Sequence, residues 1–416
     1  MKSVLIVFII FVSLTGKAFA SADTIRRADL ERETDVGDIR ARMFHQQTKL
    51  DTAIFKFRKL FIPSFSYNPS AGFELGLSVS ALKFLGHPDS TTISTGEVEV
   101  SASTKGLAAI TYKHNVYLPK NKWSLQGNWQ VARTLALDYG VGTGRRSEYS
   151  VLSNAPADDI YQLKYTSFKF RETAYKKIEG NFYGGIGLIL NAYTGIDEER
   201  RDNTNAYHYQ YSAGNNFPLW HYLYNAFTLN LQYDSRDHPN RPYKGIYANL
   251  GFKAADEILG SSQNATQLIT EFRKYWSLSA NNPQHVLAFW HWGSYLLSGK
   301  IPYLELPGTS GDNDGRSGRA YTVGRFKGFS FFYSETEYRF PISANKLLSG
   351  VAFVNAQTGS NTSGILPVKL FRQWEPGGGI GLRILYNKYS RSNICVDYGV
   401  GKYGSSGFFI NLNETF

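Results

Sequence analysis

Apolar and polar positions alternate along most of this chain, and residues 407–416 show the pattern most clearly. Every second residue of an extended strand lies on the same face. One face of this segment carries Phe408, Ile410, Leu412, Glu414 and Phe416, and the other carries Phe409, Asn411, Asn413 and Thr415. A half-apolar strand that finishes on an aromatic residue is typical of a transmembrane barrel, in which one face meets lipid and the other meets the lumen. We therefore expect Phe408, Ile410, Leu412 and Phe416 to share one face of a terminal membrane strand, with the final aromatic at the membrane interface.

The same alternation, interrupted by turn signals, predicts about sixteen strands between residues 62 and 416. The predicted strands span about 62–68, 72–85, 94–103, 107–118, 122–134, 160–175, 180–193, 221–234, 245–254, 266–279, 285–297, 331–341, 347–357, 377–387, 393–401 and 407–416. The long connections 135–158, 195–218 and 298–329 all follow odd-numbered strands, so they lie at one end. Bacterial outer-membrane barrels have long outer loops and short periplasmic turns. We therefore predict an all-β fold, an antiparallel transmembrane β-barrel over residues 62–416.

Charged residues within the predicted strands indicate which face points inward. A charge in hydrocarbon is costly, so Glu335, Glu337 and Arg339 must share the lumenal face of their strand. In the strand 393–401, Cys395 and Asp397 are expected inside, and their neighbours Ile394, Val396 and Tyr398 outside.

The first residues predict export. Residues 1–20 contain Lys2, a short apolar run and a small-residue ending, which is the pattern of a cleaved signal peptide. Residues 21–61 are too few for a separate domain, and we expect them to form a short periplasmic or lumenal segment. A single cysteine, Cys395, excludes an internal disulfide framework.

The amino-acid composition and net charge indicate which kinds of molecule the protein can contact. The mean hydropathy of −0.31 is compatible with a barrel, because alternation hides the lipid-facing residues, and 15% aromatic residues suit two interfacial girdles. The net charge of +11 would interact with anionic lipids and lipopolysaccharide, or would simply reflect scattered loop charges. Nucleic acid is not an expected partner of an exported chain, and no cofactor is expected.

Two connections carry further chemistry. The stretch 233–245 places Asp234, Arg236 and Asp237 at a strand end and Gly245 after the turn, so these groups are expected to hold the turn together. The long Gly-rich loop carries Arg319 and Arg325, which are candidates for pairing with Glu335 and Glu337 inside the lumen. Asp312–Gly315 has the start of a calcium loop but lacks the later Glu, so no metal site is predicted.

Together these motifs resemble the BamA/TamA superfamily, the outer-membrane barrels that insert or translocate other proteins. The final strand is similar to the sorting signal of that family, and 233–245 to its acidic motif before the ninth strand. Arg319–Ala320–Tyr321 is similar to the tip of its sixth outer loop, whose arginine docks inside the barrel; Gly324–Phe326 and Glu337–Pro341 are similar to the continuation.

The departures from the family pattern bear on function. Ala320 replaces a glycine, Asn355 stands where the family supplies the acid that meets the loop arginine, and Cys395 stands where an arginine is common. The resemblance therefore implies a weaker attachment of the loop unless Glu335, Glu337 or Asp397 replaces the missing acid. The insertases also carry periplasmic polypeptide-binding domains, which residues 21–61 are too short to form.

Three functions follow as alternatives. The first is a barrel without periplasmic domains that acts in outer-membrane biogenesis or protein transport, together with assembly machinery or client proteins. Its first strand contains Pro63 and is followed by Pro69, so the seam with the last strand should pair poorly. The second is a passive outer-membrane channel or a plugged structural barrel. An enzyme is not expected, because the chain contains neither G-x-S-x-G nor H-E-x-x-H.

Overall fold

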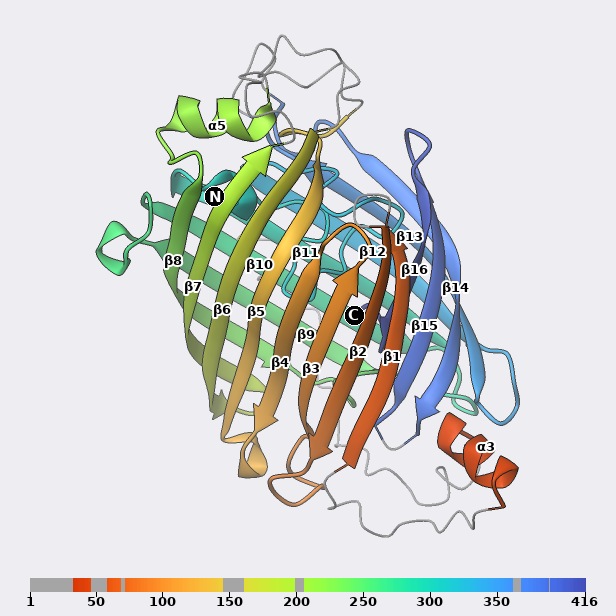
Figure 1. Ribbon diagram of the computed structural model, residues 1–416. Helices are drawn as coiled ribbons and strands as arrows, with labels where there is room; N and C mark the ends of the chain where they lie inside the picture. Colours follow the sequence, from red (N-terminus) through yellow and green to blue (C-terminus); the bar gives the residue numbers. More distant parts are fainter. Residues whose placement is uncertain are drawn as a thin grey trace.

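A computed structural model describes residues 33–45, 58–68, 72–144, 161–198, 206–361, 368–388 and 390–416. Sixteen strands form one antiparallel sheet in which each strand pairs with its neighbours in the sequence. The sheet curls into a barrel, so that its first and last strands lie against each other (Figure 1). The predicted barrel is confirmed, while the predicted signal peptide, residues 1–20, lies outside the described residues.

The strand bounds lie close to the predicted ones over most of the chain. In the first half they are β1 Arg58–Asn68, β2 Gly72–Lys83, β3 Ser94–Ser103, β4 Ala108–Tyr117, β5 Trp123–Asp138, β6 Tyr161–Glu179, β7 Phe182–Glu198 and β8 His221–Asp234. In the second half they are β9 Gly245–Ala255, β10 Ala265–Ser277, β11 Val286–Gly299, β12 Ser330–Pro341, β13 Leu348–Gly359, β14 Glu375–Asn387, β15 Ser392–Gly401 and β16 Ser406–Leu412.

Long and short connections separate to the two ends of the barrel, as predicted. One end, here called the loop end, carries the connections β5–β6, β7–β8, β11–β12 and β13–β14. The other, the turn end, carries short turns, including the 3₁₀ turn η1 (Pro119–Asn121). Among the described residues, no helix is long and apolar enough to cross a membrane.

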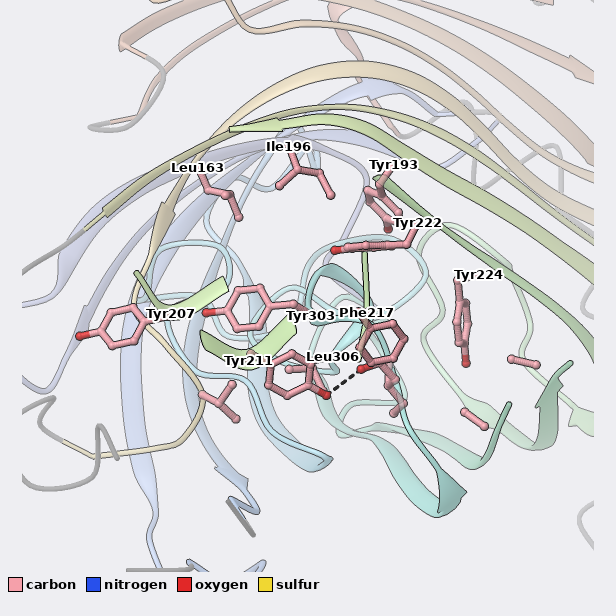
Figure 2. Packing of buried hydrophobic residues seen from close by; sticks show 14 of the residues in the cluster. Leu163, Tyr193, Ile196, Tyr207, Tyr211, Phe217, Tyr222, Tyr224, Tyr303 and Leu306 are labelled. Atoms are coloured by element: carbon pink, nitrogen blue, oxygen red, sulfur yellow. Dashed lines mark hydrogen bonds between the residues drawn. The ribbon is translucent and has the colours of Figure 1, made fainter. Parts of the chain in front are cut away.

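An aromatic core closes part of the loop end (Figure 2). The short helix α5 (Tyr207–Asn215) and the 3₁₀ turn η3 (Tyr303–Glu305) pack there against the inner walls of β6 to β8. Tyr211 donates a hydrogen bond of 2.7 Å to the main-chain oxygen of Ile301, which ties the helix to the β11–β12 loop. Rings of this size bury much apolar area and interlock at edge-to-face angles. Within this part of the lumen, packed tyrosines therefore replace water.

The described part of the N-terminal segment contains helix α3 (Val36–Met43), which is capped by Asp35. Asp38 forms an ion pair of 2.8 Å with Lys388, in the turn after β14, and the main-chain N–H of Thr34 donates to Asn345 O in the turn after β12. This helix therefore lies against the turn end, beside the short turns (Figure 1). The strand β1 begins at Arg58, four residues before the predicted start at residue 62.

The seam between β1 and β16 differs from every other strand contact. The two strands touch, but no backbone ladder joins them in the described part of the chain. Near the turn end, the hydroxyl of Tyr386 on β14 donates 3.0 Å to the main-chain oxygen of Phe61. All fifteen other junctions are antiparallel ladders, so this seam is the weakest pairing in the sheet.

Candidate functional site: a charged cluster that holds a loop in the lumen

The β11–β12 loop enters the barrel and places Arg319 in contact with three strands, β12, β13 and β15. The guanidinium of Arg319 forms ion pairs of 2.5 Å with Glu335 on β12 and 2.7 Å with Asp397 on β15, and it also pairs with Glu337. It lies 3.8 Å above the ring of Phe353 as well. All of these polar groups are buried. A guanidinium presents several donors in a fixed plane, so it can contact three carboxylates at once where a lysine could not.

More arginines and one more acid extend this arrangement, which we call the Arg319 cluster. Its members are Arg241, Arg319, Arg339, Arg383, Glu335, Glu337, Asp397 and Glu414. Four guanidinium groups thus face four carboxylates, and the formal charge of the cluster is zero. Burying unpaired charge is costly, and paired burial is tolerable only when the remaining hydrogen-bonding positions are filled. In the structure, the cluster therefore joins the loop to the strands β12 and β15.

The predicted candidates Arg319, Glu335, Glu337 and Asp397 come together in this cluster. Asn355 also contacts this cluster, but it donates hydrogen bonds where an acid would accept them. Its side-chain N–H₂ donates 2.9 Å to Arg319 O and 3.2 Å to Glu335 Oε2. Glu335 and Asp397 supply the charge that Asn355 lacks. Arg383 is the register partner of Cys395 and supplies a guanidinium beside the position where the family often has one.

The structure places the candidate Arg325 elsewhere, outside this cluster. Its guanidinium lies 4.8 Å from the ring of Tyr139 and 4.7 Å from that of Phe326, towards the loop end. Arg325 was a candidate because it is close to Arg319 in the sequence. The intervening turn at residues 321–325 directs its side chain towards these aromatic rings instead. Ala320, at the glycine position of the family, has φ of 94°. This is a left-handed conformation that glycine adopts more easily than alanine.

The expectation that the terminal strand keeps one lipid face through Phe416 is wrong. Phe408 is 70% exposed and Ile410 44%, as expected for lipid-facing residues, but β16 ends at Leu412. Asn413 has φ of 66°, and the chain then turns into the lumen, where Phe416 is 4% exposed and stacks on Trp290 at 5.3 Å. The physical reason is Glu414, whose carboxylate pairs with Arg383 at 2.7 Å rather than entering lipid.

Residues 413–416 and the loop hold each other inside the barrel. Arg316 of the loop donates to Glu414 O and, at 2.9 Å, to Leu412 O, and Arg339 donates 2.9 Å to Phe416 O. Burial alone would raise the pKa of Glu414. The charges of Arg383, Arg339 and Arg241 outweigh burial and hold that pKa well below its usual range.

The acidic motif after β8 forms the turn that the sequence predicts, and it also reaches the cluster. Asp234 accepts from Arg236 Nη2 at 2.8 Å, and Asp237 accepts from the main-chain N–H of Tyr243 at 2.8 Å. Gly245 has φ of 113°, and a Cβ there would lie 2.4 Å from Ser235 O. The shape of this turn brings Arg241 to 3.4 Å from Glu414. The turn therefore joins the wall at β8–β9 to the opposite side of the barrel.

Sequence reasoning missed three members of the Arg319 cluster, namely Arg241, Arg383 and Glu414. It also missed Arg316, which contacts the main chain of Leu412 and Glu414. Arg383 and Glu414 carried a usable signal, because each is a charge inside a predicted strand and must avoid lipid. Arg241 and Arg316 lie in irregular segments, where periodicity gives no direction. The aspartate of the calcium-like stretch caps its own loop, since Asp312 accepts from the main-chain N–H of Arg316 and Ser317 at 2.9 and 2.7 Å.

Comparison with known proteins agrees with this architecture. The model of the Omp85 superfamily domain matches residues 83–416. BamA from Haemophilus ducreyi lacking POTRA domains 1–3 is similar in structure, with a TM-score of 0.52 and 15% identity over 94% of this chain and 82% of that one. CdiB from Acinetobacter baumannii has a TM-score of 0.49 and 13% identity, covering 86% and 60% of the two chains. No curated protein matches.

At 15% identity the likeness to BamA establishes the fold alone, whereas the family model covers most of the chain. A curled antiparallel sheet, a lumenal loop held through an arginine and a lipid-facing apolar belt all agree with that match. The chain is an integral outer-membrane β-barrel and belongs to the Omp85 superfamily.

Proposed function

We propose that this barrel acts in outer-membrane biogenesis or protein transport by offering the edges of β1 and β16 to polypeptide segments of client proteins. The observation that carries the proposal is the seam, where two strands touch without a ladder in the described residues. An unpaired strand edge is a template for another strand, because its N–H and C=O groups seek partners.

The inward turn at Asn413 adds to this argument. Residues 413–416 are committed to the lumen through Arg316, Arg339 and Arg383, so they do not extend β16 along β1. β16 has 7 residues and β1 has 11, which leaves part of the β1 edge without a strand partner. The resulting free edge lies on the turn-end side of the seam and would receive a client strand from the periplasm.

A reversible lock across the seam tests the proposal. In a Cys395→Ser background, cysteines replace Ser64, Phe65 or Ser66 in turn on β1 and Phe408 on β16, and the disulfide is formed by mild oxidation. The control lock joins Leu229→Cys and Phe252→Cys, which are register partners on β8 and β9.

We expect the seam lock to lower the abundance of other outer-membrane proteins, as measured by quantitative mass spectrometry, and we expect reductant to restore it. The control lock should leave the profile unchanged. An unchanged profile with a fully formed seam disulfide would refute a role for the seam.

A passive channel is the second candidate, favoured by a lumenal cavity of about 850 Å³. The loop crosses this space, however, because Asn128 on β5 donates 2.9 Å to Asn313 O and Lys113 on β4 lies 3.8 Å from Asp314. We therefore expect small, unsteady conductance in planar bilayers. A large steady conductance of the unmodified protein would favour the channel instead.

A further inference from the structure

An ionisable pair faces lipid on the outside of the barrel wall. In the register of β4, β5 and β6, His114 lies opposite Gly127, which lies opposite Glu172. The same outward face carries Ile110, Val131 and Phe168, which are 55%, 51% and 48% exposed. Alternation along each strand therefore places His114 and Glu172 among lipid-facing residues, and their neighbours Lys113 and Arg171 face the lumen.

The pair lies flat against the wall because Gly127 has no side chain. His114 Nε2 is 3.1 Å from Glu172 Oε1, and Trp129 Nε1 donates 3.0 Å to the other carboxylate oxygen. A Cβ on Gly127 would lie 2.2 Å from His114 Cε1 and 2.4 Å from Glu172 Oε2. Three strands thus cooperate to build one polar site.

The depth of the site follows from the lysines on its strand. Lys176 lies over the ring of Trp123 at 5.5 Å, a cation–aromatic contact of the kind found at membrane interfaces, and we infer the turn-end boundary from it. Glu172 lies four residues from Lys176 along β6, which is about 10 Å along the membrane normal for a tilted strand. The exposed Lys164 marks the other boundary, further along the same strand. Lipid headgroups therefore lie beyond the reach of this carboxylate.

The protein itself does not fill every hydrogen-bonding position of this site. His114 is buried and its Nδ1 has no hydrogen-bond partner among the described residues, while the side chain of Glu172 remains 23% exposed on the lipid side. His291, also on the lipid face, provides a contrast. Its two ring nitrogens contact Thr270 Oγ1 at 2.8 Å and Tyr333 O at 2.9 Å, so both have hydrogen-bond partners.

We propose that the His114–Glu172 pair is a docking site for a membrane-spanning segment of another protein, which donates a hydrogen bond to Glu172 from a hydroxyl, amide or guanidinium side chain. Ionisable groups that face hydrocarbon are rare and generally mark functional contacts. The carboxylate accepts hydrogen bonds, its depth excludes headgroups, and the apolar wall of Ile110, Val131 and Phe168 supplies the flanking contact.

Photo-crosslinking in intact outer membranes tests this assignment. Benzoylphenylalanine replaces Phe168, four residues from Glu172 on the same lipid face of β6, or Val354, a lipid-facing residue on β13 across the barrel. We expect an adduct at Phe168 with a different protein, whose linked peptide maps to a membrane-spanning segment, and only lipid adducts at Val354. The double variant Glu172→Leu/His114→Phe should reduce the protein adduct about tenfold, as loss of a charged hydrogen bond predicts.

Several outcomes overturn the proposal. They are lipid adducts alone at both positions, equal protein adducts at both, an adduct with a second copy of this chain, and an adduct that the double variant leaves unchanged. The comparison of Phe168 with Val354 needs no change at the pair, so it decides the question even if the double variant fails to fold. Heat-modifiable migration in gels checks the folding of each variant.

Discussion

The barrel wall carries ionisable side chains on its lumenal face and on its lipid face. The two sets differ in how far other side chains of the protein pair with them. Inside, the Arg319 cluster opposes four guanidinium groups to four carboxylates, and the loop and residues 413–416 deliver part of each set. Outside, the His114–Glu172 pair has a single companion donor in Trp129 and keeps one carboxylate partly exposed. Charge balanced within the chain fixes a conformation, whereas charge left incomplete on a lipid face indicates a contact with another molecule.

The strongest way to break the inner cluster is Arg319→Ala. Three buried carboxylates would lose their common partner, and removal of one partner from a buried ion pair costs about 3–5 kcal/mol. We expect this variant to unfold at a lower urea concentration than the wild type in detergent micelles, with gel mobility as the measure of unfolding. Arg325→Ala is the matched control from the same loop, because Arg325 lies against aromatic rings and outside the Arg319 cluster, and it should cost less than Arg319→Ala. Equal destabilisation by both variants would contradict the assigned role of Arg319.

Glu414→Gln should cost less, about 2–3 kcal/mol at neutral pH, since hydrogen bonds to Arg383 persist without the charge. The pKa of Glu414 is lowered in the folded protein, so its contribution is complete above the unfolded pKa of 4.5 and is lost as the pH falls through the lower folded value. The difference in unfolding free energy between wild type and variant should therefore persist at pH 5 and shrink only below pH 4.5. A difference that grows on acidification would contradict this sign.

Asn355→Asp sharpens the comparison with the family, because it adds the acid that the family pattern contains. In this chain the cluster is already balanced, and Asn355 donates to Glu335. The aspartate would lose that donor and repel the glutamate, so we expect destabilisation of about 1–2 kcal/mol. Asn355→Ala is the control, since it loses the donor without adding charge. A stabilised aspartate variant would show that the cluster has spare positive charge.

The smallest effect is expected for Lys113→Ala, on the wall opposite the cluster. Its pair with Asp314 is 3.8 Å long and partly exposed, and such pairs contribute about 0–1 kcal/mol. Stability should hardly change, while access of a thiol reagent to a cysteine introduced at Asn313 should increase. An effect as large as that of Arg319→Ala would mean that the loop is anchored equally on both walls.

Much of the fold could be read from the alternation of side chains, but the site could be read only in part. Glu335, Glu337 and Asp397 were found because a charge within a strand must avoid lipid. Glu414 breaks this rule, because alternation puts its charge on the lipid face of the predicted strand. Strand periodicity does not reveal where a strand ends, however, and no Gly or Pro marks the turn at Asn413. Arg241 was missed because a turn residue has no periodic face, and its contact lies 173 residues away in the chain, at Glu414.

The separation in sequence of the partners of Arg319 has a consequence for biosynthesis. Glu335 follows Arg319 by 16 residues, but Asp397 follows it by 78. If strands are added in sequence order, the loop waits with a partly compensated guanidinium until β15 arrives, and residues 413–416 complete the arrangement last. Docking of the loop would then act as a late checkpoint, reached only by barrels whose final strands have been added.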